Sequence, residues 1–182
     1  MEQTQDQRQF YKLHTQHPAI LHFPVALGDI IEFPNGIPGF EDIHQFEIHS
    51  HEKYRPFLFM NAVGNADVGF ICADVFYIDR NYEVRISNEV LDRLECESLQ
   101  ELAVLSIVTV GESAEKTTAN LLSPLLINVK ARKGLQVILE KSNYDINYPI
   151  WENLKNSNEN GAADKDGTNT AKNNSDKEAQ GF

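Results

Sequence analysis

Short apolar runs, broken every few residues by glycine, proline, asparagine or aspartate, fill the chain between residues 24 and 151. Runs of this length are typical of β-strands joined by turns, because an amphipathic helix would need a 3.6-residue apolar repeat over more than about ten residues. The pattern therefore predicts a mainly β domain. Its strands are expected at residues 29–33, 46–51, 57–63, 68–74, 82–86, 103–110, 117–121, 124–131 and 134–139.

Two of the runs, residues 104–110 and 125–129, are almost continuously apolar, which predicts strands that are buried on both faces. A small closed or nearly closed antiparallel β-barrel would contain such strands. One short helix is expected after Ser87, which can cap it, because Val90 and Leu94 fall on one helical face. We expect this helix to plug one end of the barrel or to pack beside it.

Three segments differ in composition. Residues 1–23 are rich in glutamine and histidine and lack strand alternation, so we expect a loosely ordered N-terminal extension with a short helical turn at Phe10, Tyr11 and Leu13. Residues 24–151 are expected to form the β-barrel domain. Residues 152–182 contain no leucine, isoleucine or valine after Leu154, and they predict a disordered polar tail.

The formal net charge of −11 is concentrated in the predicted barrel domain. Residues 1–23 balance to zero and residues 152–182 carry −2, which leaves −9 on residues 24–151. A surface of this sign repels nucleic-acid phosphates and favours a basic protein partner, although a surface that only keeps the protein soluble would look the same. The basic patch at Lys130, Arg132 and Lys133 is too small for RNA binding alone. We therefore expect no direct contact with nucleic acid.

Neither a membrane segment nor a leader is visible in the sequence. No apolar run approaches the roughly 18–20 residues of a membrane helix, and the N-terminus lacks the basic flank and apolar stretch of a signal peptide. We expect a cytoplasmic protein without a membrane partner. In that reducing compartment, Cys72 and Cys96 are not expected to form a disulfide.

The most distinctive segment, residues 33–41, places two prolines and two glycines between aromatic residues. Proline fixes φ and glycine allows positive φ, so this segment predicts a shaped loop. An aromatic ring and a carboxylate exposed there would suit an interface anchor, but a loop that only caps a strand has the same composition. The partner-binding candidates in this segment are Phe33, Pro34, Gly36, Ile37, Pro38, Gly39, Phe40 and Glu41.

A second group of polar residues, Asn120, Pro124 and Asn128, surrounds a predicted strand–turn–strand unit. Asparagine side chains at bends usually satisfy backbone groups, and we expect that role here. We also expect this turn to be a neighbour of the 33–41 loop. The three residues are therefore further partner-binding candidates.

No motif for catalysis is present: the chain lacks G-x-S-x-G, a P-loop, H-E-x-x-H and a dinucleotide fingerprint. His49 and His51 fall on one face of a predicted strand, which raises the possibilities of a metal site or a hydrolase. No cysteine or acid at a suitable spacing completes either site. We predict that the protein is not an enzyme and that it has no cofactor and no metal site. A small-molecule-binding β-barrel is the alternative, because closed barrels often enclose ligands.

Several segments, taken in order, resemble the flagellar assembly factor FliW family. They are IEFPNGIPGFE at residues 31–41, PF at 56–57, LSIVTV at 105–110, TANLLSPLLIN at 118–128 and GLQVIL at 134–139. The resemblance covers about residues 29–148.

The resemblance implies a small β-barrel-like protein with two protein partners, the translational regulator CsrA and flagellin. In that family the protein antagonises the repression of flagellin mRNA by CsrA and binds newly made flagellin as a chaperone-like partner switch. The chain would then act in flagellum biogenesis and translation regulation. The 33–41 loop and the turn at residues 120–128 would line part of the binding surface.

Overall fold

The computed structural model describes residues 10–13, 29–140 and 142–153. The predicted polar tail at residues 152–182 lies outside the described residues apart from its first two positions, and so does most of the predicted extension at residues 1–23. The division of the chain at residues 23 and 151 therefore stays a prediction.

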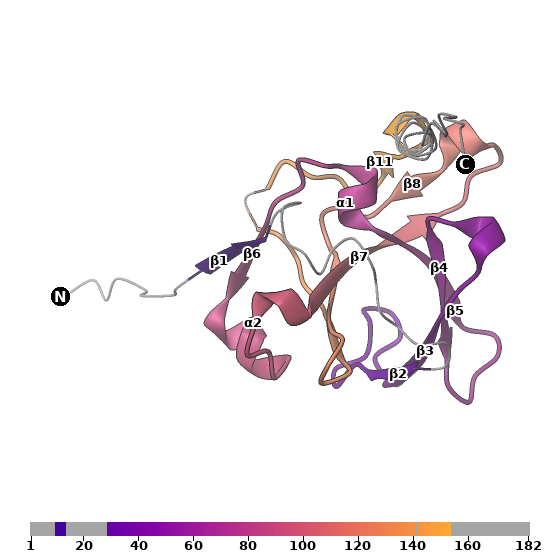
Figure 1. Ribbon diagram of the computed structural model, residues 1–182. Coiled ribbons are helices and arrows are strands. Elements are labelled where there is room, and N and C mark those ends of the chain that lie inside the picture. The colour runs from indigo at the N-terminus through magenta and orange to yellow at the C-terminus, as the bar shows by residue number, and fades with distance from the viewer. Residues whose placement is uncertain (1–9, 14–28, 141, 154–182) are drawn as a thin grey trace, which may run out of the picture.

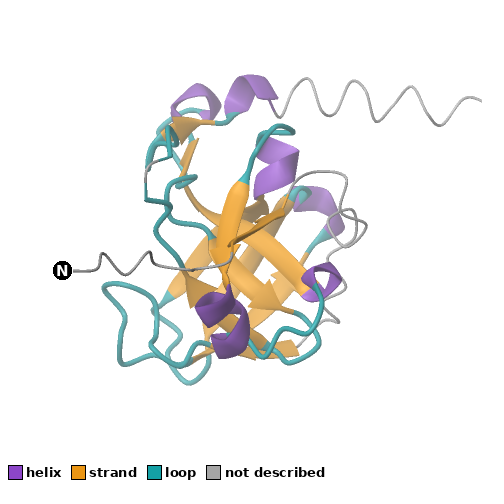
Figure 2. Ribbon diagram, turned by 90° about the vertical axis from the view of Figure 1, so that its left-hand side faces the viewer, coloured by secondary structure: helices purple, strands orange, loops and turns teal. Residues whose placement is uncertain are grey.

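Seven strands form a closed barrel, as predicted (Figures 1 and 2). In spatial order they are β7, β5, β4, β3, β2, β10 and β9, and β9 pairs back onto β7. Their bounds are β2 (Asp29–Glu32), β3 (Gln45–Ser50), β4 (Phe57–Ala62), β5 (Gly69–Asp74), β7 (Leu102–Thr109), β9 (Leu125–Asn128) and β10 (Lys133–Gln136).

One strand pair of the barrel is parallel. β10 runs parallel to β2, with Lys133 opposite Glu32, whereas the other pairs of the ring are antiparallel. Strand direction must alternate around a ring of antiparallel neighbours, and seven strands cannot alternate completely. A seven-stranded closed barrel therefore requires at least one parallel pair, which the expectation of an antiparallel barrel did not include.

Four strands lie outside the ring. β8 (Thr118–Ala119) pairs with β7, and β11 (Tyr148–Pro149), which we did not predict, pairs with β8. β1 (Phe10–Leu13) and β6 (Val84–Ser87) form a separate two-stranded sheet (Figure 1). The predicted helical turn at residues 10–13 is thus wrong, because backbone pairing with β6 and burial of Leu13 override the local pattern.

The predicted helix is α2 (Asn88–Arg93), and the Ser87 hydroxyl accepts a hydrogen bond from the backbone N–H of Val90. α2 packs beside the barrel through Val90, Leu91 and Leu94. A second short helix, α1 (Val75–Ile78), was not predicted, because its four apolar residues simply continue the apolar run of β5. In the described part of the chain, 3-10 turns occupy Glu52–Tyr54, Leu99–Glu101 and Ala114–Lys116. No helix in the described ranges is long and apolar enough to cross a membrane.

Two hydrophobic cores share the barrel wall. The inner core fills the barrel and includes Phe33, Phe46, Met60, Cys72 and Leu125. The outer core lies between the barrel and the segments outside it, and includes Leu13, Tyr82, Leu94, Val104 and Leu126. Alternate residues of β7 and β9 enter different cores, which confirms that these strands are buried on both faces.

Candidate protein-binding surface

The 33–41 loop is anchored in the inner core by a row of aromatic rings. Phe33 is fully buried and packs edge-on against Phe46, with ring centroids 5.5 Å apart. Phe46 contacts Phe70 at 5.8 Å, and Phe70 contacts Phe40 edge-on at 5.1 Å. The row runs from the barrel interior to the surface, since Phe40 is 36% exposed. Edge-on contacts of this kind stabilise one ring arrangement, so the loop has a fixed attachment.

The backbone of the loop requires its glycines. Gly36 has φ +64°, and a Cβ atom there would lie 2.6 Å from the Cα atom of Glu41. Gly39 has φ +87°, and its N–H donates to the Glu41 carboxylate at 2.8 Å. This hydrogen bond is the main reason why the pKa of Glu41 is lowered. The Phe40 N–H donates to the Ile37 carbonyl at 2.6 Å, which closes the tip of the loop.

The candidates in the loop separate into an anchor and an exposed tip. Phe33, Gly36 and Ile37 are buried, whereas Pro34, Pro38, Gly39, Phe40 and Glu41 are exposed. Ile43 and Phe70, both half-buried, adjoin the tip through a backbone hydrogen bond and a ring contact with Phe40. We call Pro38, Phe40, Glu41, Ile43 and Phe70 the loop-tip surface.

The second group of candidates, Asn120, Pro124 and Asn128, forms hydrogen bonds within the protein. The Asn120 side chain accepts from the Ser123 N–H at 2.9 Å, and the carbonyl of buried Pro124 accepts from the Val137 N–H at 3.0 Å. The Asn128 side chain is completely buried. The expectation that these asparagines satisfy backbone groups is confirmed. Their predicted partner-binding role stays a prediction.

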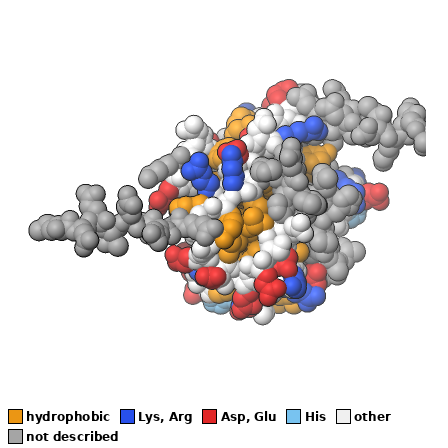
Figure 3. Space-filling view, turned by 60° about the vertical axis from the view of Figure 1, so that its left-hand side comes forward, with side chains coloured by type: hydrophobic (Ala, Val, Ile, Leu, Met, Phe, Trp, Pro, Cys, Tyr) orange, Lys and Arg blue, Asp and Glu red, His pale blue; other side chains and the backbone are white. Residues whose placement is uncertain are grey.

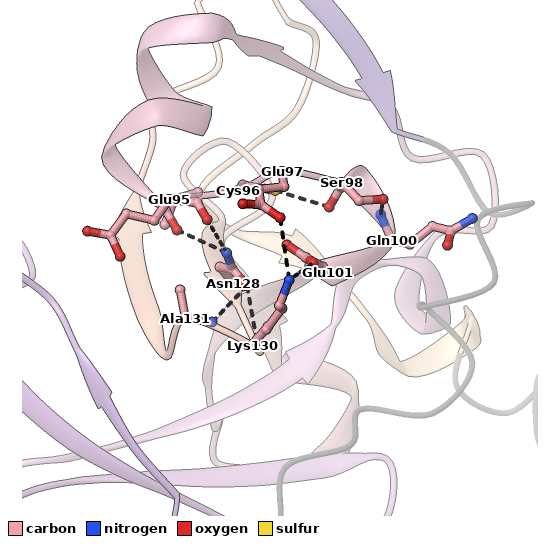
Figure 4. Close-up of polar contacts among 10 residues, drawn as sticks. Glu95, Cys96, Glu97, Ser98, Gln100, Glu101, Asn128, Lys130 and Ala131 are labelled. Atoms are coloured by element: carbon pink, nitrogen blue, oxygen red, sulfur yellow. Dashed lines mark hydrogen bonds and ion pairs between the residues drawn. The ribbon is translucent and has the colours of Figure 1, made fainter.

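Asn128 joins α2 to the turn between β9 and β10 (Figure 4). Its amide donates to the carbonyls of Leu94 and Glu95, both at 3.0 Å, and its oxygen accepts from the N–H groups of Lys130 and Ala131 at 3.0 and 3.1 Å. These four bonds use the full capacity of an asparagine side chain. We call these five residues the α2–β9 junction.

The junction contains a tight helix end. Glu95 has φ +50°, and its N–H donates to the Asp92 carbonyl, while the Cys96 N–H donates to the Leu91 carbonyl. This is the Schellman arrangement, which usually has glycine at the position of Glu95. Asn128 completes it by binding two carbonyls that the helix leaves without partners.

The basic patch beside the junction is neutralised. Each cation of the patch forms an ion pair with a carboxylate. The distances are 3.0 Å for Lys130–Glu101, 3.0 Å for Arg132–Asp29 and 2.6 Å for Lys133–Glu95. The hydrogen bond to Glu101 is the main cause of the raised pKa of Lys130. Cations that are already paired offer little free charge to a phosphate.

The structure brings Asn128, but not Asn120, close to the start of the 33–41 loop, because Lys133 pairs with both Asn128 and Glu32, the residue before the loop. β2, from which the 33–41 loop leaves, lies at the bottom of Figure 1, and β8, which precedes Asn120, lies at the top. Asn128 is at the opposite end of β9 from Pro124. Because the Asn120 and Asn128 side chains bond within the protein and Pro124 is buried, the candidate site taken forward is the loop-tip surface. The sequence pointed to Phe40 and Glu41 but missed Ile43 and Phe70, because strand register decides which aromatic residue meets Phe40.

The histidines that raised the metal hypothesis have other contacts. His49 Nε2 lies 3.2 Å from the Glu47 carboxylate, and His51 Nδ1 accepts from the Lys53 N–H at 3.2 Å. His44 Nδ1 lies 3.2 Å from the Phe33 carbonyl. Within the part of the chain that the structure describes, no three His, Cys, Asp or Glu side chains gather as a metal-ligand group.

The half-buried carboxyl group of Asp74 stands apart from these surfaces. Asp74, at the end of β5, caps α1 by accepting from the Phe76 N–H at 2.8 Å. Burial raises the pKa of Asp74 to about 7, against hydrogen bonds from Phe76 and Tyr77 that lower it. The sequence alone gives no sign of this shift, because the burial that raises the pKa depends on how the end of β5 packs in the fold.

These features define the class of the molecule: a small closed β-barrel that presents a rigid, partly apolar loop tip. A crystal structure of the flagellar assembly factor FliW has the same fold, with a TM-score of 0.65 and 32% identity, over 78% of this chain and 97% of that one.

The sequence relationship is equally direct. The model of the family described as "FliW protein" matches residues 6–150. The flagellar assembly factor FliW of Thermoanaerobacter pseudethanolicus is 40% identical over 130 residues, which cover 71% of this chain and 87% of the relative. That of Caldanaerobacter subterraneus subsp. tengcongensis is 35% identical over 147 residues, covering 80% and 97%. The chain belongs to the FliW family.

Proposed function

We propose that this protein is a cytoplasmic flagellar assembly factor that binds CsrA, antagonises its repression of flagellin mRNA, and binds flagellin as a chaperone-like partner switch. Family membership over residues 6–150 carries the proposal, since the relatives are named flagellar assembly factors. The protein acts by binding, without a catalytic step. Accumulating flagellin displaces CsrA, which then represses flagellin translation.

The loop-tip surface is the contact that we assign to flagellin. Exposed Phe40 and half-buried Phe70 form an aromatic pair, and the aromatic row and the Gly39–Glu41 hydrogen bond hold them in place. A preorganised surface loses little conformational freedom on binding. Amphipathic helices, such as the terminal segments of flagellin, dock their apolar face on surfaces of this kind.

The charge distribution supports a basic partner such as CsrA. Residues 24–151 carry −9, and the cations of the basic patch are paired with carboxylates. Figure 3 shows acidic side chains along the lower part of one face of the molecule. Complementary charge accelerates association, and raised salt should slow it.

The test is a binding titration of the full chain with purified CsrA and with monomeric flagellin. Phe40→Ala combined with Glu41→Lys should weaken flagellin binding at least tenfold, about 1.4 kcal/mol. Ile138→Ala, at another strongly exposed apolar side chain, serves as the control and should bind as the wild type does. The absence of a complex with either partner would reject the function. If the folded double variant bound both partners with unchanged affinity, the loop-tip surface would be rejected as the binding site.

The alternative of a small-molecule-binding barrel is less well supported. Large side chains that are almost completely buried, among them Phe33, Phe46, Ile48 and Met60, fill the barrel interior. Barrels that enclose a ligand need room that these side chains occupy. A thermal-shift screen would still detect a ligand by its stabilisation of the fold.

A further inference from the structure

β1 is attached to the rest of the described molecule through a single neighbouring strand. Its four residues pair with β6 alone, from Phe10 opposite Ser87 to Leu13 opposite Val84. The two strands form their own sheet, separate from the barrel (Figure 1). The backbone contacts of β1 are therefore confined to one short edge.

The two strands differ in how firmly their side chains are held. In β6, Val84 and Ile86 are almost completely buried in the outer core. In β1 only Leu13 is buried, at 1% exposure, whereas Phe10 is 58% exposed. Lys12 adds an ion pair with Glu83, in which both side chains are about half exposed and which therefore contributes little. β6 is part of the body of the protein, whereas β1 is held, among the described residues, by its edge on β6, by buried Leu13 and by half-buried Tyr11.

Release of β1 would leave a defined acceptor site. The edge of β6 would present unpaired N–H and C=O groups, which is a template for another extended segment. The outer core would lack the leucine side chain, and Glu83 would lack its cation. The site fits an extended segment with a lysine followed by a large aliphatic residue.

We propose that the β6 edge is a strand-exchange site, which residues 10–13 of a second copy of this chain occupy in place of the copy's own β1. The second copy carries the same leucine and lysine, so it reproduces each contact seen within one chain. The 15 residues between β1 and β2 can span at most roughly 50 Å, enough for β1 to reach a neighbouring molecule. Figure 3 brings this side of the molecule forward and shows an apolar area at its centre.

A labelled peptide with the sequence of residues 8–15 tests the site. It should bind full-length Leu13→Asp protein at least tenfold more tightly than wild type, because the chain's own strand no longer competes. A peptide with the same Leu→Asp change should not bind. Val110→Asp, at an exposed position of the barrel, is the control and should bind the peptide as wild type does. Equal binding by wild type and Leu13→Asp, or binding by neither, overturns the site.

Two measurements on the unmodified chain cover the case in which Leu13→Asp does not fold. Amide hydrogens of β1 should exchange at least 100-fold faster than those of β4, and equal protection would make β1 an integral strand. Light scattering should detect a dimer whose fraction rises with protein concentration. A wild-type protein that remains monomeric at the highest attainable concentration overturns the second copy as the occupant.

Discussion

The 33–41 loop and the α2–β9 junction are both irregular segments held in one conformation, but different interactions hold them. Aromatic contacts from Phe33 to Phe40 anchor the loop, and its tip remains exposed. The junction is fixed by the four hydrogen bonds of Asn128, which leave that side chain nothing to offer a partner. An apolar anchor can therefore leave a tip exposed, whereas a saturated polar anchor serves only the fold.

The largest effect is expected from Asn128→Ala. Loss of the amide leaves two carbonyls and two N–H groups of the junction without their partner, which should cost about 3 kcal/mol or more of unfolding free energy. Urea denaturation measures this loss. Asn120→Ala is the matched control, because it removes one hydrogen bond, from the Ser123 N–H, and should cost about 1 kcal/mol. Equal losses would show that Asn128 does not hold the junction.

Gly36→Ala tests whether close backbone packing holds the 33–41 loop in its conformation. The new Cβ would lie 2.6 Å from backbone atoms of Phe40 and Glu41 at a positive φ, so the loop must shift, at a cost of about 2–3 kcal/mol. Gly39→Ala is the control, since Gly39 also has positive φ but no atom lies within 4 Å of its added Cβ. It should cost about 1 kcal/mol, from backbone strain alone. If both variants lose the same stability in urea, close packing at Gly36 is not what shapes the loop.

Sequence reasoning predicted the two segments unequally. Prolines and glycines around Phe33 and Phe40 indicated a shaped loop, because these residues act through their own φ angles. The closed barrel followed from strands that are apolar on both faces. The contact of Phe40 with Phe70 and the pairing of β1 with β6 depend on register between distant strands, which local patterns do not encode. The same limit explains why the sequence does not separate Asn128, which lies beside the start of the loop through Lys133, from Asn120.

Asp74→Asn tests whether a half-buried polar side chain that caps a helix stabilises the fold more when it is uncharged, as the Asn128 side chain is. The folded-state pKa of Asp74, about 7, lies above its ordinary value of 3.8. The stabilising contribution of protonated Asp74 to the wild type is therefore fully present below pH 3.8 and is lost as the pH rises through about 7. Asparagine keeps the capping oxygen without the charge.

At pH 8 the Asp74→Asn protein should be about 2 kcal/mol more stable than wild type, less than the full shift implies because the new amide N–H groups are themselves buried. Urea midpoints measured from pH 4 to pH 8 should converge at the acidic end. If the difference in urea midpoint between the two proteins does not change with pH, the burial of charge at Asp74 does not cause the stability difference.

The smallest effect is expected from Glu101→Gln, at the edge of the junction, where the Glu101 side chain is 18% exposed and its partner Lys130 is mostly exposed. Glu101 lies 3.0 Å from Lys130, and this bond is the main reason why the Glu101 pKa is lowered. The contribution of Glu101 is present above its ordinary pKa of 4.5 and is lost as the pH falls through the lower folded-state value. Because the Lys130 side chain is 66% exposed, solvent and salt screen the pair, so the urea midpoint should move only slightly and the difference should vanish in 1 M NaCl. Glu112→Gln, which breaks the exposed pair with Lys116, is the matched control. A loss from Glu101→Gln as large as that from Asn128→Ala would mean that ion pairs hold the junction, and the contrast between a saturated amide and an apolar anchor would fail.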